Sequence, residues 1–169
     1  MKIIYNNPSI SGTPEKLLEM LSHIRYKDFS RLMSPLEVFI SCCGSCHDQS
    51  MLEFQELSDM RLDPKAKFIL AVDENGNGLE THSFVYFNRD NKFCWIENAW
   101  EEMRGLHWFS SYDDMIRYIM TKFIERVNPA KSYFLADFNP DEHTIGENLD
   151  ELVDICMNSA YEFEPSGTI

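Results

Sequence analysis

The sequence has no hydrophobic run that approaches the roughly 18 residues needed to cross a bilayer. Residues 1–8 lack the apolar stretch and the small-residue cleavage site of a secretion signal. Positive charge is scarce, with 15 Lys and Arg against 28 Asp and Glu, so the net charge is −13. Nucleic acids and anionic membranes repel such an acidic chain, and no basic stripe reverses this locally. We therefore expect a cytoplasmic protein that binds neither.

Internal repeats, linkers and low-complexity segments are also absent. The five cysteines are an odd number in a chain without a secretion signal, which fits reduced thiols better than a disulfide framework. The chain has 169 residues, of which 44% are hydrophobic and 13% aromatic, enough for one ordered core. We expect a single domain over residues 1–169, with its core at about 13–160 and a frayed tail at 165–169.

Helix and strand signals alternate along the chain. Thr13-Pro14 has the form of an N-cap followed by proline at the first helical position. Hydrophobic spacing, capping residues and breakers predict further helices over residues 36–40, from Cys46 to before Pro64, from a cap at Ser110 or Ser111 to about Val127, and over 148–156. Strands are expected over residues 67–72, 81–87, 92–96 and 132–138. This order predicts an α+β fold in which helices, including the one that begins at Cys46, pack on a mostly antiparallel sheet.

Cys46 stands in a polar turn, Gly44-Ser45-Cys46, that opens directly into a predicted helix. A thiol in the first turn of a helix faces the positive end of the helix dipole and free N–H groups, and both favour thiolate. His82 lies in the second predicted strand, and Glu97 and Asn98 follow at the end of the third. A thiol, an imidazole and a polar orienting group in this setting are the parts of a catalytic triad.

The chain resembles the transglutaminase-like superfamily, which shares its fold with papain-like enzymes. In that superfamily a Gly-x-Cys turn begins the nucleophile helix, a histidine opens one strand, and an acid lies on the next. The matching segments here are Gly44-Ser45-Cys46, residues 81–86 and residues 95–100, so the middle third matches well and the ends poorly.

The resemblance implies an enzyme in which Cys46 attacks an amide or other acyl group and His82 takes and returns the proton. The acyl group then passes to water, as in a peptidase, amidase or deamidase, or to an amine. A protein or peptide substrate is expected, with no cofactor and no metal.

The third triad residue depends on how the hairpin between the second and third strands pairs. The superfamily usually has Asp there, which this chain lacks. An even loop, Arg89-Asp90 or residues 88–91, puts Glu97 directly opposite His82, with Cβ atoms about 5 Å apart. A three-residue loop over 89–91 puts Asn98 there instead. Glu97 is favoured because a carboxylate matches the superfamily's acid, and Asn98 is the alternative.

Other site roles are less defined by the sequence. The Cys46 N–H is the natural first oxyanion donor, Gln49 one turn along is a candidate second, and Trp100 is a candidate wall of the substrate groove. His47 is expected to point into solvent. Two other classes stay open, a catalytically silent protein-binding module and a zinc-binding regulatory domain. Zinc is disfavoured because the cluster of Cys42, Cys43, Cys46 and His47 lacks a second Cys-rich knuckle.

Overall fold

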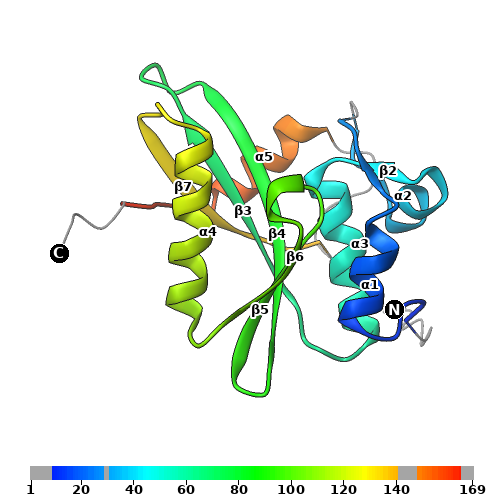
Figure 1. Ribbon diagram of the computed structural model, residues 1–169. Helices are drawn as coiled ribbons and strands as arrows, with labels where there is room; N and C mark the ends of the chain where they lie inside the picture. Colours follow the sequence, from blue (N-terminus) through cyan, green and yellow to red (C-terminus); the bar gives the residue numbers. More distant parts are fainter. Residues whose placement is uncertain (1–8, 29–30, 141–147, 165–169) are drawn as a thin grey trace.

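The computed structural model describes residues 9–28, 31–140 and 148–164. A six-stranded sheet lies between two layers of helices (Figure 1). Its strands run in the order β6-β5-β4-β3-β7-β8, and every neighbouring pair is antiparallel. A separate two-stranded sheet pairs β1 with β2 in parallel, next to the start of α3.

The elements are as follows in chain order. The helices are α1 (Pro14–Leu21), α2 (Pro35–Ser41), α3 (Cys46–Asp59), α4 (Tyr112–Arg126) and α5 (Leu149–Met157), with one 3-10 turn, η1 (Glu101–Met103). The strands are β1 (Arg25–Tyr26), β2 (Cys43–Gly44), β3 (Lys65–Val72), β4 (Gly78–Arg89), β5 (Lys92–Glu97), β6 (Gly105–Phe109), β7 (Ser132–Phe138) and β8 (Tyr161–Glu162).

Both faces of the central sheet are apolar and covered. Because successive side chains of a strand point to opposite faces, Phe68 and Leu70 of β3 belong to one core and Ile69 and Ala71 to the other. The first core includes side chains of α1, α2, α3 and α5, and the second includes one face of α4. Figure 1 shows α4 on one side of the sheet and α1 and α3 on the other. The site therefore stands on a sheet that is held from both sides.

The expected α+β class, with the Cys46 helix packed on an antiparallel sheet, is confirmed. Sequence patterns found each of the longer helices and the four inner strands to within a few residues. They missed the edge strand β6, whose residues are mostly half-buried and show no strict alternation. They also missed β1, β2 and β8, which have two residues each. The single-domain prediction stays a prediction, and the tail at 165–169 lies outside the described residues.

The β4–β5 hairpin differs from both expected registers. Val85 pairs with Ile96 and Arg89 with Lys92, so Asp90 and Asn91 alone form the loop. Both have positive φ, 53° and 59°, which is the type I′ turn favoured by the right-handed twist of the strands. Neither Glu97 nor Asn98 is therefore directly opposite His82. Continued by one step, the register places Glu97 opposite Phe84, which makes His82 its diagonal neighbour on the same face.

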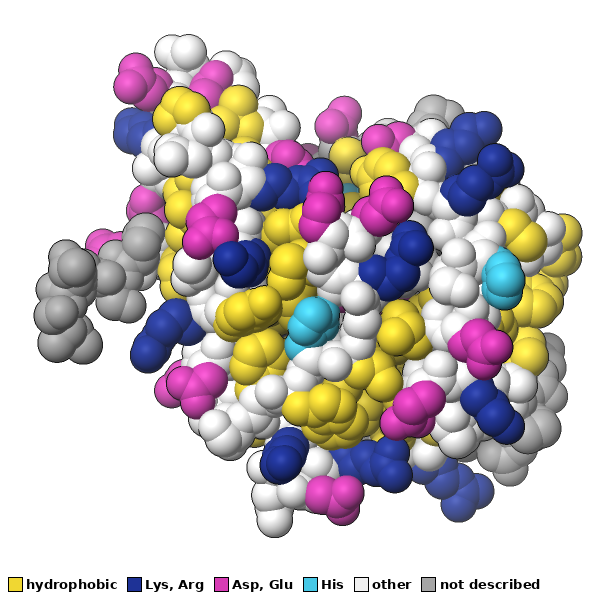
Figure 2. All heavy atoms as spheres, viewed as in Figure 1, with side chains coloured by type: hydrophobic (Ala, Val, Ile, Leu, Met, Phe, Trp, Pro, Cys, Tyr) yellow, Lys and Arg dark blue, Asp and Glu magenta, His cyan; other side chains and the backbone are white. Residues whose placement is uncertain are grey.

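None of the helices in the described part of the chain is both long and apolar enough to cross a membrane. On the face drawn in Figure 2, basic and acidic side chains are interspersed and do not gather into separate areas. Hydrophobic atoms show between them where α4 approaches the sheet (Figure 2).

Candidate active site

The turn before α3 is fixed by a buried carboxylate. Asp48 accepts hydrogen bonds from the Ser45 N–H (2.9 Å), the Ser45 hydroxyl (2.8 Å) and the Met33 N–H (2.7 Å). Its own N–H is capped by the Ser45 hydroxyl, so the two residues form a capping box. A Cβ at Gly44 would lie 3.0 Å from the Asp48 Cβ, so a larger residue there would push the turn apart. These contacts place Cys46 at the first position of α3.

Cys46 is buried at the edge of a pocket and faces strand β4. Its sulfur lies 4.0 Å from the carbonyl oxygen of Thr81, the residue before His82. The N–H groups of the first helical turn have no acceptor within the helix, so the N–H of Cys46 takes no partner from α3. The helix start thus presents a thiol and an N–H donor at the same point.

His82 and Glu97 form a buried pair. His82 Nε2 lies 2.8 Å from Glu97 Oε2, and both side chains are almost fully enclosed. The carboxylate can only accept, so Nε2 carries the proton, which leaves Nδ1 as the ring nitrogen for the thiol. The second Glu97 oxygen accepts the Trp100 N–H at 2.8 Å. Each oxygen of the Glu97 carboxylate therefore has a hydrogen-bond donor, and the imidazole is held in one orientation.

The diagonal geometry explains why this pair forms although the expected register was wrong. Diagonal neighbours on a sheet are about 7–8 Å apart at the backbone, a gap that a glutamate and a histidine bridge together. A direct cross-strand position was thus not required. Asn98, the alternative third residue, points to the opposite face of the sheet and contacts Gln49 instead of His82.

His47 is buried, and the expectation that it points into solvent is wrong. Its Nδ1 lies 2.5 Å from the Ser83 hydroxyl and its Nε2 3.2 Å from the Thr81 hydroxyl. Its ring also stacks on Phe68, with centroids 5.6 Å apart. The signal that was missed is the pair of hydroxyl residues flanking His82, which face α3 on the other side of β4. Through these hydrogen bonds His47 links α3 to β4, the strand that carries His82.

The thiol and imidazole shift each other toward the charged forms. Burial raises the pKa of Cys46, but the charges and hydrogen bonding of His47 and His82 outweigh it and lower the pKa to about 6. Burial lowers the pKa of His82, but Glu97 and Cys46 outweigh it and raise the pKa to about 10. Each ion removes the desolvation cost of the other, so the thiolate–imidazolium pair is the stable form near neutral pH.

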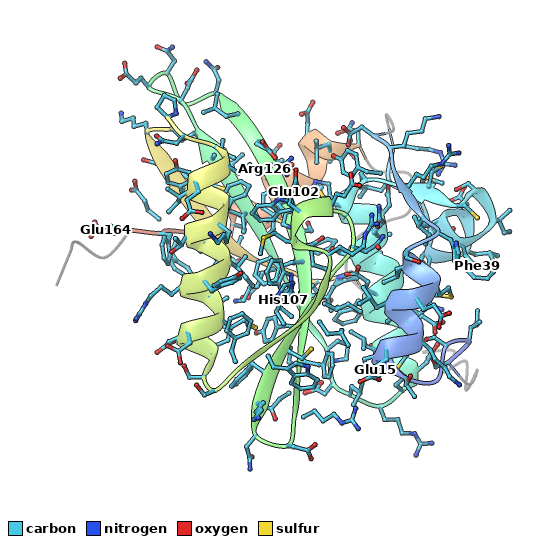
Figure 3. All side chains as sticks on the ribbon, in the orientation of Figure 1. Glu15, Phe39, Glu102, His107, Arg126 and Glu164 are labelled. Atoms are coloured by element: carbon cyan, nitrogen blue, oxygen red, sulfur yellow. The ribbon has the colours of Figure 1, made fainter. Side chains whose placement is uncertain are left out.

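Trp100 closes the pair from the pocket side. Its ring meets the His82 ring edge-on, with centroids 5.5 Å apart, and the Arg126 guanidinium lies over the indole, 5.3 Å from the ring centroid. Arg126 in turn bonds Glu80 at 2.7 Å and lies 3.8 Å from Glu102. Figure 3 shows Arg126 and Glu102 together where the end of α4 meets the segment before β6. The indole thus shields the imidazole from water.

A pocket of about 230 Å³ opens beside the thiol. Cys46, His82 and Trp100 line it, so the candidate groove wall Trp100 does lie there. Its remaining lining comes from β1, β4, η1, α4 and the segment between β5 and η1: Tyr26, Glu80, Thr81, Ala99, Glu101, Glu102, Phe123 and Arg126. A carbonyl group entering this pocket would meet the thiol, the imidazole and the helix N–H together.

Gln49 is not placed to act as an oxyanion donor. Its side chain is buried, with Nε2 donating to the Gly44 carbonyl at 2.9 Å and Oε1 accepting from Asn98 Nδ2 at 2.7 Å. Both ends of the amide are therefore occupied within the protein. Gln49 does lie one turn after Cys46 on α3, but its side chain turns toward the end of β5 and not toward the pocket.

The side chains of residues 42–47 form no metal-binding group with one another or with other described residues. Within the described ranges no group of three or more His, Cys, Asp or Glu side chains is arranged to hold one. Cys42 is exposed, and His47 has both ring nitrogens on hydroxyl groups. Cys94 and Cys156 are buried in the apolar core, and burial raises the pKa of each thiol to about 12. Those two are structural residues.

Comparison with known proteins adds little to this geometry. No protein-family model matches the chain, and no curated protein matches it. Among solved structures it is similar to Legionella pneumophila LapG, with a TM-score of 0.41 and 12% identity over 86% of this chain and 75% of that chain. A likeness at that level supports no conclusion about activity. The functional proposal therefore rests on the residues of this chain.

Proposed function

We propose that the protein is a cysteine-dependent enzyme that cleaves or transfers an amide or other acyl group through Cys46, His82 and Glu97. The observation that carries the proposal is the buried His82–Glu97 pair next to a thiol at a helix start, with a pocket that Cys46 and His82 line. The order of these residues along the chain is also that of the transglutaminase-like superfamily. Perturbed groups of this kind cluster at catalytic sites.

In the proposed reaction the Cys46 thiolate attacks the carbonyl carbon of the substrate, and the carbonyl oxygen takes up the negative charge. The N–H of Cys46 donates to that oxygen. The His82 imidazolium then gives its Nδ1 proton to the leaving amine, the carbon–nitrogen bond breaks, and a thioester remains on Cys46. A second nucleophile, water or an amine, loses its proton to His82 and releases the acyl group.

Glu97 and Trp100 position the imidazole during both steps. The carboxylate holds Nε2 and stabilises the imidazolium, so Nδ1 stays directed at the sulfur. The backbone N–H of Trp100 donates to the Glu97 carboxylate, and the Trp100 ring packs against the imidazole. Neither needs to touch the substrate for this role.

The test is formation of an acyl-enzyme. The protein is mixed with p-nitrophenyl acetate, the release of nitrophenolate is followed, and the intact mass of the protein is measured. We expect a burst of about one equivalent and an acetyl adduct that peptide mapping assigns to Cys46. Cys46→Ala should abolish both, whereas Cys43→Ala, a matched thiol in the same segment, should leave both unchanged. An adduct spread over several thiols, or no burst in the wild type, would contradict the proposal.

Hydrolysis and transfer are distinguished by the fate of the adduct. The isolated acetyl-enzyme is incubated with water alone or with added lysine or another primary alkylamine. Faster deacylation with formation of the acetylated amine identifies a transferase. A decay rate that the amines do not change identifies a hydrolase.

A further inference from the structure

A second buried carboxyl group lies behind the proposed site and has no role in the reaction above. Glu53 of α3 is 3% exposed. Within residues 9–28, 31–140 and 148–164, its carboxyl group has no hydrogen-bond donor and no cation at ion-pair distance. A buried carboxylate in that setting is costly, and the group avoids the cost by keeping its proton.

An acceptor without a donor belongs to a residue that contacts α3 through Gln49. Asn98 Oδ1 is buried and has no hydrogen-bond partner among the described residues. The same amide donates through Nδ2 to Gln49 Oε1, and Gln49 is one helical turn before Glu53 on the same face of α3. Side chains of a helix tilt toward its N-terminus, so we expect the Glu53 carboxyl group to lean back over Gln49, the side chain that Asn98 contacts.

We propose that Glu53 is a positioning residue that stays protonated in the folded protein and donates its O–H to Asn98 Oδ1. The proton heads a relay in which each group donates to the next: Glu53 to Asn98, Asn98 to Gln49 at 2.7 Å, and Gln49 to the Gly44 carbonyl at 2.9 Å. The relay joins the strand end that carries Glu97 to the turn that carries Cys46. It goes beyond the proposed reaction and holds whether or not Cys46 turns over a substrate.

The charges around Glu53 act in the same direction. Glu97 of β5 and the Cys46 thiolate of its own helix disfavour a second negative charge, and the His82 imidazolium of β4 only partly offsets them. Burial is the largest cause of the raised pKa of Glu53. With Glu53 neutral, His82 is paired with a single carboxylate, Glu97.

The proton is observed directly by infrared spectroscopy at pH 7. We expect a protonated-carboxyl band in the wild type that disappears in Glu53→Gln. Glu56→Gln is the matched control, because Glu56 is also buried on α3 but accepts hydrogen bonds from Ser9 and Ser11 as a carboxylate does. Labelling glutamate side chains with 13C at the carboxyl carbon gives the same readout by NMR in the unmodified protein. Absence of a protonated glutamate resonance at pH 7 overturns the proposal even if the variants fail to fold.

The relay itself is tested by rescue. Glu53→Ala removes the donor, and we expect the pH midpoint of Cys46 alkylation to shift from its wild-type value. Glu53→Gln keeps an N–H donor and should restore the midpoint. The pKa of Glu53 is higher in the folded protein than in the unfolded chain, so its protonated form stabilises the fold at low pH. The wild type should therefore lose stability as pH rises above the ordinary glutamate range. Glu53→Gln should not. Equal midpoints in Ala and Gln variants, or equal pH profiles of stability in wild type and Gln, would refute the relay.

Discussion

Replacing His82 with Ala should change the pH dependence of Cys46 alkylation more than the rate of alkylation at neutral pH. The pKa of Cys46 is about 6, against an ordinary value of 9.0, and His82 is one of the two histidines that lower it. His47 remains in the variant, so we expect a rise of about 2 units, or about 2.7 kcal/mol. The thiolate fraction at pH 7 then falls about tenfold.

A less acidic thiol, however, is intrinsically more nucleophilic. With a Brønsted coefficient of about 0.4–0.5, a rise of about 2 units makes each thiolate about eightfold more reactive. The two effects nearly cancel at pH 7. At pH 5 the thiolate fraction falls about 90-fold, so the net rate falls about tenfold. A comparison at neutral pH alone would therefore miss the effect.

The assay is the rate of iodoacetamide alkylation of Cys46 between pH 4 and 10, with the site identified by peptide mapping. We expect a midpoint near 6 in the wild type and about 2 units higher in His82→Ala. His107→Ala is the matched control, because the ring of His107, a residue of β6, binds the Met103 carbonyl of η1 and stacks on Trp95. Unchanged midpoints in His82→Ala and wild type would refute the thiolate–imidazolium pair.

Further predictions concern the groups around this pair. Asp48→Ala leaves three buried donors without an acceptor and should lower the free energy of unfolding by about 3–5 kcal/mol in urea titrations; a loss below about 1 kcal/mol would contradict the capping role. Glu97→Gln should lower the pKa of His82 from about 10, seen by NMR titration of the ring protons, because the carboxylate charge is lost. Acyl transfer in the wild type should follow a bell-shaped pH profile, rising through about 6 as Cys46 ionises and falling through about 10 as His82 loses its proton. His47→Gln should raise the alkylation midpoint of Cys46 as well, and an unchanged midpoint would confine His47 to packing.

Several parts of the site were readable from the sequence because they depend on local chemistry. The cap Ser45, the glycine before it and the helix that follows are specified within a few residues of one another, so Cys46 could be placed at a helix start. The strand carrying His82 and the next strand were evident from their β-prone residues between turn formers. The chemistry of a carboxylate favours Glu97 as the partner of His82, although the register expected from the sequence is wrong.

Other parts depended on which faces of the elements meet. Whether His47 points to solvent or to β4 depends on the angle at which α3 lies on the sheet, and the sequence does not contain that angle. The same holds for Gln49 and Asn98, which are polar residues of ordinary appearance until helix and strand bring their amides together. Glu53 and Arg126 were missed because an acidic or basic residue on a helix is usually solvated. The spacing of Glu53, two turns after Cys46 on the same face, was the available signal.

The sequence by itself determined the α+β class, the helix that begins at Cys46, and the nature of the groups that follow it. Those features arise from caps, periodicity and side-chain chemistry within short segments. Only the tertiary structure decided that Asp90 and Asn91 form the hairpin loop and that Glu97 reaches His82 diagonally. Only it decided that Trp100 covers the imidazole and that a second histidine lies against the thiol. These depend on strand register and on helix placement, which are set by packing across the sheet between residues far apart in the chain.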